Sequence, residues 1–235
     1  GSLGNFLYST GPGELWVHQF VGSETRLDLD GQPVWVCQQT RYPWDGQVTL
    51  TLKLEQPQRF SVFLRLPEWC QAYGVQVNGQ PLGLQPEANG YLLIRRLWQD
   101  QDTLTFEMEM PVRFTWANPH VRQLQGRAAI QRGPLVYCLE GTDHPGAALN
   151  QISIDPAGAA GSFRAVWAPD TLGGAVIITG KGKRTSTEGW EKTLYRSAAP
   201  LETDIDITAV PYSLWCNREP GEMRVLRQPA HRGDL

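Results

Sequence analysis

The chain has 235 residues, 21 basic and 24 acidic side chains, and a formal net charge of −3. Its lysines and arginines are scattered singly, which excludes the basic stripe of a nucleic-acid-binding protein or of a protein that binds anionic membranes. No apolar run approaches the roughly 20 residues of a membrane span, so we expect neither nucleic acid nor membrane as a partner.

The N-terminal segment SLGNFLYST, residues 2–10, has the composition of the end of a secondary-structure element. Leu3, Phe6, Leu7 and Tyr8 are apolar, and Gly-Pro-Gly follows directly as a stop signal. No helix precedes these residues in the sequence, so their packing partner has to be sought elsewhere.

Hydrophobic residues then alternate with polar ones with a period of two, which is the pattern of half-buried strands. In QVTLTLKL, residues 47–54, four apolar side chains share one face, and FSVFLRL (60–66) and TLTFEMEM (103–110) repeat the pattern. We predict that the first core contains Leu50, Leu52, Val62, Leu64, Leu104 and Phe106. Residues 15–20, 25–29 and 33–39 are shorter strand candidates, and Asn78-Gly79 is a strong hairpin signal.

The alternation breaks at TWANPHVRQLQG, residues 115–126, and strand patterns resume after it. The later candidates are residues 127–141, 162–168, 174–180, 190–196 and 206–217. Turn residues recur throughout, with 24 glycines and 17 prolines. The sequence therefore predicts an all-β fold of two consecutive antiparallel β-sandwich, jelly-roll-like domains, residues 10–118 and 119–235. We interpret the two loops at 141–161 and 180–189 as solvated connections.

Four cysteines, Cys37, Cys70, Cys138 and Cys216, are too widely spaced for a zinc-ligand motif or a dense disulfide scaffold. Because an isolated cysteine usually behaves as a small buried hydrophobe, we expect free thiols in a reducing compartment and a cytoplasmic location.

The chain contains no short motif of a metal site or of a nucleophilic hydrolase. The four histidines lie far apart, and His18 falls on the polar side of its strand, which favours a surface or interface position. Asp45 and Glu140 could be named as a glycosidase pair, but such a pair needs a separation of about 5 to 10 Å that sequence spacing cannot establish. Asp45, followed by Gly46, is more typical of a turn.

Nine tryptophans are many for this length. Exposed tryptophans stack on sugars in carbohydrate-binding domains, whereas most tryptophans fill cores or domain interfaces. Trp35 faces away from Val34 and Val36, and Trp44, Trp69 and Trp116 are the better candidates for exposed or interdomain positions.

Three stretches taken in order, TRYPWDGQVTLTL, GRAAIQRGPLVYCLE and ITAVPYSLWCNREPGEMRV, resemble the C-terminal part of glycoside hydrolase family 127, the β-L-arabinofuranosidase-like enzymes. SLGNFLYST resembles the segment that closes the helical catalytic domain of that family. By this resemblance, residues 1–9 are the exit segment of an (α/α) barrel, a short remnant of a helix, and the barrel itself is outside this chain.

The resemblance implies a parent enzyme that hydrolyses L-arabinofuranosides with retention, using a cysteine nucleophile held on zinc by further cysteine and glutamate ligands, with a glutamate as acid/base. All those residues belong to the barrel, so no catalytic or metal position is assigned here. The chain is then a non-catalytic sandwich pair that supports the barrel and contributes to a homodimer. Two other hypotheses remain, an independent carbohydrate-binding module and a small hydrolase with an unrecognised carboxylate site.

Overall fold

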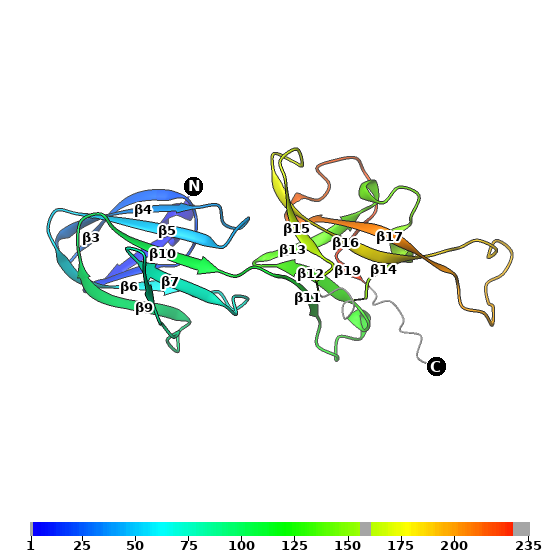
Figure 1. The fold of residues 1–235 in the computed structure, drawn as a ribbon, viewed down its shortest axis with the longest axis horizontal. Helices are drawn as coiled ribbons and strands as arrows, with labels where there is room; N and C mark the ends of the chain where they lie inside the picture. Colours follow the sequence, from blue (N-terminus) through cyan, green and yellow to red (C-terminus); the bar gives the residue numbers. More distant parts are fainter. Residues whose placement is uncertain (1, 156–160, 228–235) are drawn as a thin grey trace. The chain divides into compact units, whose positions relative to one another are not determined.

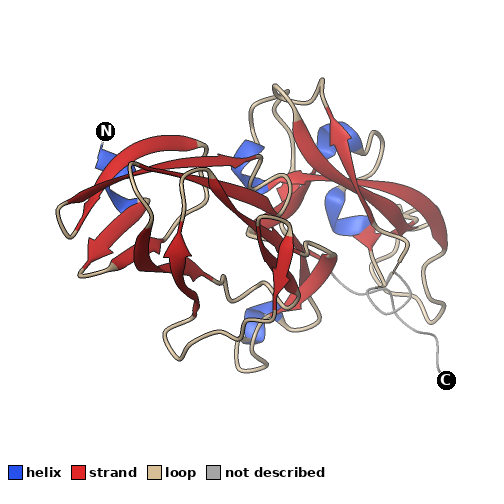
Figure 2. Cartoon of the chain, turned by 60° about the vertical axis from the view of Figure 1, so that its left-hand side comes forward, coloured by secondary structure: helices blue, strands red, loops and turns tan. Residues whose placement is uncertain are grey.

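The computed structural model describes residues 2–155 and 161–227, which form an all-β fold with a few short 3₁₀ helices (Figures 1 and 2). It divides into two compact units, residues 1–110 and 111–235. Among the described residues every strand pairing is antiparallel except that of β2 with β6. No helix there is long and apolar enough to cross a membrane.

The first unit is a sandwich of a four-stranded and a six-stranded sheet (Figure 1). The smaller sheet has the order β1-β2-β6-β9, with β1 (Tyr8–Gly11), β2 (Glu14–Val17), β6 (Gln58–Arg65) and β9 (Tyr91–Trp98). The larger sheet has the order β3-β4-β5-β10-β7-β8, with β3 (Ser23–Leu29), β4 (Gln32–Thr40), β5 (Gln47–Leu54), β10 (Asp102–Met108), β7 (Tyr73–Val77) and β8 (Gln80–Leu82).

One apolar core lies between these two sheets because the alternation turns one face of each strand inward. All six residues predicted for this core are confirmed as buried. The predicted hairpin is confirmed too, since Asn78 and Gly79 connect β7 to β8 with φ of 51° and 77°. Positive φ at both turn positions suits the right-handed twist of the flanking strands, and asparagine and glycine are the residues that tolerate it.

The second unit has nine strands in one connected sheet. Its main path is β11 (Val112–Trp116), β12 (Ala128–Arg132), β13 (Leu135–Glu140), β17 (Glu202–Pro211), β16 (Ala175–Thr185) and β14 (Ile152–Ser153). Beside it, β15 (Arg164–Ala168) pairs with β16, β18 (Met223–Arg224) with β13, and β19 (Leu226–Arg227) with β12. The stretch at 117–127 therefore connects β11 to β12 within this unit.

A separate core fills the second unit. It is built by residues of five strands and of the segments before and after β14, namely Ile130, Tyr137, Leu139, Leu149, Ile152, Ile154, Phe163, Ile178, Ile207 and Ala209. β17 pairs with β16 as far as Ala209 and with β13 at Val210 and Pro211, so this one strand joins both parts of the sheet.

Three expectations for the second unit were wrong. Residues 190–196 form no strand, and Leu194 and Tyr195 lie 87% and 89% exposed, because no strand among the described residues pairs with this segment. The sequence GKGKRT at 180–185 is not a solvated loop, since it is the second half of β16 and pairs along β17. Leu149 and Ile152 in the loop at 141–161 are buried in the second core, although residues 156–160 lie outside the described residues.

The N-terminal residues divide between two environments. A 3₁₀ helix, η1 (Ser2–Phe6), precedes β1, and the Phe6 side chain is 60% exposed. Leu7 and Tyr8, in contrast, are buried in the first core. The expectation that the packing partner of these apolar residues has to be sought elsewhere is therefore wrong for Leu7, which packs in the first core.

Candidate functional site

The outward face of the small sheet carries a group of aromatic and polar side chains. The inward positions of β2, β6 and β9 are Leu15, Val62, Leu64, Leu92 and Ile94, all in the first core. The alternating positions therefore face outward, and the strand register aligns Ser9, Trp16, Phe63 and Leu93 across all four strands. His18 and Tyr91 lie beside them. We call Ser9, Trp16, His18, Phe63 and Tyr91 the outer-face cluster.

Ring stacking holds the centre of the outer-face cluster. The rings of Trp16 and Phe63 are parallel within 3°, with centroids 3.8 Å apart, and Phe63 is buried beneath the indole. Tyr91 meets Trp16 edge-on at a centroid distance of 5.0 Å. Aromatic pairs of this kind contribute about 0.5 to 1.5 kcal/mol beyond their area burial, so the three rings form a firm apolar platform.

His18 connects both sides of the platform by hydrogen bonds. Its Nε2 lies 2.8 Å from the Ser9 hydroxyl, and its Nδ1 lies 2.8 Å from the Tyr91 hydroxyl. Burial and then the neighbouring Arg65 charge lower the pKa of His18 below 6.5. A neutral imidazole has one donor and one acceptor, which is the set that two hydroxyls can satisfy.

The hydrogen bonds from Ser9 to His18 to Tyr91 resemble those of a nucleophilic triad only in that a histidine stands between a serine and a third polar side chain. In such a triad a carboxylate stabilises the imidazolium that forms during attack. Here the third member is the hydroxyl of Tyr91, and the lowered pKa of His18 opposes formation of the cation. The outer-face cluster is therefore suited to binding and positioning rather than to proton transfer.

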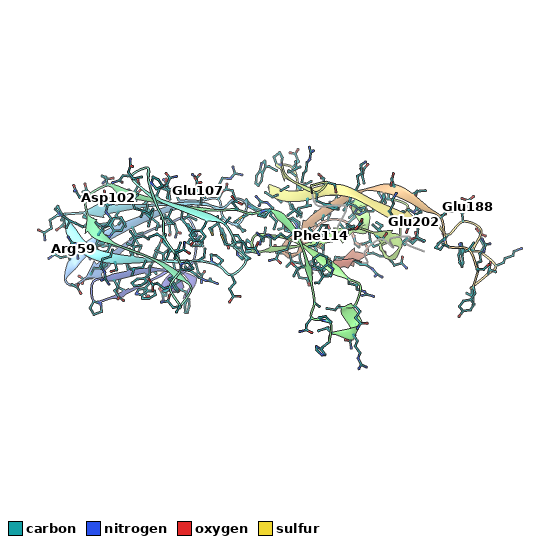
Figure 3. The ribbon with its side chains drawn as sticks, turned by 60° about the horizontal axis from the view of Figure 1, so that its bottom comes forward. Arg59, Asp102, Glu107, Phe114, Glu188 and Glu202 are labelled. Atoms are coloured by element: carbon teal, nitrogen blue, oxygen red, sulfur yellow. The ribbon has the colours of Figure 1, made fainter. Side chains whose placement is uncertain are left out.

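Three cationic side chains lie near the outer-face cluster on the β6 and β9 side. Arg59, Arg65 and Arg95 stand at outward positions of β6 and β9, and all three are exposed. Figure 3 labels Arg59 on the first unit. Glu14, the carboxylate on this face, accepts a hydrogen bond of 3.0 Å from Trp16 Nε1. The face as a whole is aromatic at its centre and positively charged at its margin.

A second polar cluster lies in the second unit, where Arg218 bridges two carboxylates. Its NH1 and NH2 donate to the two oxygens of Asp143 at 2.7 and 2.6 Å, and its Nε donates to Glu140 Oε2 at 3.1 Å. The backbone N–H of Cys216 donates to the other Glu140 oxygen at 3.1 Å. These contacts raise the pKa of Arg218, with the Asp143 hydrogen bond as the largest cause. We call Glu140, Asp143 and Arg218 the carboxylate clamp.

The carboxylate clamp fastens the segment 216–224 to the end of β13. Next to it, the Gly141 N–H donates to the Glu222 carbonyl and the Leu149 N–H donates to the Glu222 carboxylate, both at 2.8 Å. Both clamp carboxylates are thus paired with one guanidinium, which is an arrangement that stabilises structure. Glu140 therefore gives no support to a sugar-cleaving carboxylate pair.

The other residues named from the sequence occupy separate places. Asp45 accepts from the Gln47 N–H at 3.3 Å and pairs with Arg41, so its interpretation as a turn residue is confirmed. His18 follows β2 and is half-buried, and its contacts with Ser9 and Tyr91 put it on the outward side of the small sheet, in agreement with the predicted polar side of this segment. His120 is exposed, His144 is buried under β17 with its Nδ1 on the Glu140 carbonyl, and His231 lies outside the described residues.

The tryptophans are spread over both units. Trp35 faces outward as predicted, with Arg26 over its ring, while Trp98 is fully buried. Trp116 is 56% exposed, whereas Trp44 and Trp69 are half-buried. Trp69 packs on the first core and stacks on Tyr42.

The residues described here do not fit a zinc site. No group of three or more histidine, cysteine, aspartate or glutamate side chains within the described ranges could hold a metal ion. All four cysteines are thiols, with Cys70 and Cys138 buried, Cys37 half-buried and Cys216 exposed. Two of them lie in each unit.

Family models match both units. The model described as β-L-arabinofuranosidase, GH127 middle domain, matches residues 14–110. The model of the glycoside hydrolase family 127 C-terminal domain matches residues 112–228.

Among curated proteins, the chain is similar to a non-reducing end β-L-arabinofuranosidase of Bifidobacterium longum subsp. longum. The two are 33% identical over 239 residues, which cover 97% of this chain and 35% of that protein. Among solved structures, a GH127 β-L-arabinofuranosidase from Geobacillus stearothermophilus T6 has a TM-score of 0.91 and 38% identity, covering 97% of this chain and 36% of that one. A second, described as a glycoside hydrolase, has a TM-score of 0.86 and 32% identity over 97% and 37%. The chain thus spans about a third of the length of these relatives.

Proposed function

The chain belongs to glycoside hydrolase family 127, and we propose that it is the non-catalytic β-sandwich region of a β-L-arabinofuranosidase-like enzyme. The observation that carries this proposal is the match of the family's middle and C-terminal domains to the two units, over about a third of the length of the relatives. A middle domain implies that another domain precedes it. We assign catalysis to that preceding helical domain and support of it to this chain.

The proposed reaction of the whole protein is retaining hydrolysis of terminal L-arabinofuranosides. The similarity to β-L-arabinofuranosidases supports the substrate class. Zinc would hold and ionise the cysteine nucleophile within the preceding domain, since residues 2–155 and 161–227 of this chain offer no group of side chains that could hold a metal ion. In this proposal the chain contributes no catalytic residue.

We also propose that the second unit contributes to a homodimer. The loop at 186–201 beyond the β16–β17 hairpin exposes Leu194, Tyr195 and Leu201 by 87%, 89% and 73%. Glu188 lies out in this loop and Glu202 begins β17 (Figure 3). Large apolar side chains with such exposure favour a protein interface. Light-scattering mass tests this, because replacing Leu194 and Tyr195 with serine should convert a dimer to a monomer.

A reducing, cytoplasmic location completes the proposal. Its support is that all four cysteines are thiols, the exposed Cys216 included, which is the usual state of cysteines in a reducing compartment.

The test of the supporting role compares three proteins: the preceding domain joined to this chain, the preceding domain alone, and this chain alone. We expect only the joined protein to keep hydrolysing a chromogenic aryl L-arabinofuranoside during prolonged incubation. If the preceding domain alone is equally active and equally durable, this chain has no supporting role.

A further inference from the structure

We propose that the outer-face cluster, together with Arg65 and Arg95, is a docking surface for an acidic surface patch of the domain that precedes the middle domain. This inference rests on the function proposed above and specifies which face of the first unit makes the contact.

The composition of this face is unusual for one in contact with water. The solvent side of an antiparallel sheet ordinarily carries polar residues at alternate positions. Here the aligned outward positions of β2, β6 and β9 are Trp16, Phe63 and Leu93. Leu97, the outward neighbour of Arg59 on β9, is 44% exposed. Three aligned apolar positions flanked by exposed arginines are typical of a surface that another protein surface covers.

The position of the chain's N-terminal residues indicates what covers it. β1 begins at Tyr8 and is the edge strand of this same small sheet, hydrogen-bonded to β2. η1 leads directly into β1, so a domain whose chain enters through η1 is held close to this sheet. The inward side of the sheet is already filled by the first core, which leaves the outward side for the tethered domain.

Charge complementarity specifies the chemistry of the covering surface. Arg59, Arg65 and Arg95 face outward, while Glu14 is the carboxylate described on this face and is already bonded to Trp16. His18 adds no charge at neutral pH because its pKa is lowered. Like charges facing each other across an interface are unfavourable, so the covering patch should carry aspartates or glutamates opposite Arg65 and Arg95.

The hydrogen-bond network fits a docking surface as well. Ser9, His18 and Tyr91 hold one another by bonds of 2.8 Å, so the rotamers are fixed before the partner arrives. An interface whose side chains are already ordered loses less conformational entropy on association.

The experiment measures hydroxyl-radical labelling of Trp16, His18 and Tyr91 in this chain and in a longer protein. The longer protein carries the preceding family domain ahead of residue 1, either from its own gene or grafted from the Geobacillus stearothermophilus relative. Trp35, half-buried on the outward face of the other sheet, is the internal control. The charge variant is Arg65→Glu with Arg95→Glu, and its matched control is Lys53→Glu, also exposed and outward-facing on β5.

We expect labelling of the outer-face cluster to fall by about tenfold in the longer protein, which corresponds to about 1.4 kcal/mol of docking free energy. Labelling of Trp35 should not change. The double arginine variant should restore labelling in the longer protein, whereas Lys53→Glu should leave the protection intact. Melting of the 235-residue chain alone should change little with either variant, because the three side chains are exposed.

Equal labelling of the cluster in the short and long proteins would overturn the proposal. So would protection of the cluster in the 235-residue chain by an arabino-oligosaccharide, which would make this face a sugar-binding surface. Arabinofuranosidase activity is measured on the same longer protein. If the longer protein is inactive but its cluster is protected, the proposed function is contradicted and the docking surface is supported. If the longer protein is active but its cluster is unprotected, the docking surface is contradicted and the proposed function is supported.

Discussion

Replacing Arg218 with methionine tests the carboxylate clamp. The variant keeps an aliphatic stem but removes the cation that Glu140 and Asp143 share, and their side chains are only 6% and 15% exposed. Removing one partner of a buried ion pair costs about 3 to 5 kcal/mol. Because the Arg218 side chain is 25% exposed, we expect a loss near the lower end, about 3 kcal/mol of unfolding free energy.

The assay is urea unfolding of the second unit, with tryptophan fluorescence as the signal. Combining Arg218→Met with Glu140→Gln should recover part of the loss, because the second change removes the unpaired buried charge. Arg224→Met, at an exposed arginine of β18, should cost less than about 0.5 kcal/mol. A loss below about 1 kcal/mol for Arg218→Met would show that the clamp acts as an ordinary surface ion pair.

Three further predictions concern the first unit. Leu64→Ala should cost about 2 to 5 kcal/mol in denaturant unfolding because Leu64 is fully buried; a loss under about 1 kcal/mol would refute the face assignment of β6. Gly46→Ala should lower the melting temperature sharply, since its Cβ would lie 1.9 Å from the Met108 carbonyl oxygen, and an unchanged melting temperature would contradict this packing. The lowered pKa of His18 means that the unfolded chain takes up the proton first as the pH falls below 6.5. Stability should therefore decrease from pH 6.5 downward, and His18→Asn should reduce that decrease in melts recorded at several pH values; an identical pH profile in both proteins would be the contrary result.

Local alternation was sufficient to predict many of the strands of the first core, although not β1 or β9. β5 occupies the predicted residues 47–54. Its four apolar side chains alternate with polar ones over eight residues, so only an extended strand turns all four toward the core. The turn at Asn78-Gly79 was equally visible, since its backbone geometry suits few residue types.

Pairing partners were not visible from local pattern. Residues 180–185 have little β-propensity, yet they pair along β17 and are linked across it by Lys181–Asp206 and Lys183–Asp204. The segment 190–196 has apolar residues at strand-like positions but no partner strand. A segment becomes a strand when a neighbouring strand pairs with its backbone by hydrogen bonds. A single sequence does not show which segments pair.

The two clusters were missed for the same reason. His18 and Tyr91 are separated by 73 residues, and Glu140 and Arg218 by 78, so their contact depends on strand order and register. The alternation in YLLIRRLW, residues 91–98, was a usable signal for β9 and would have placed Tyr91, Leu93 and Arg95 on one face.

The most direct test of the central claim is turnover of a chromogenic aryl L-arabinofuranoside by the 235-residue chain alone, with zinc content measured by elemental analysis on the same sample. The account predicts no turnover and no stoichiometric zinc, because catalysis is assigned to the preceding domain. Turnover that survives exhaustive purification and disappears on mutating a carboxylate of this chain would contradict it.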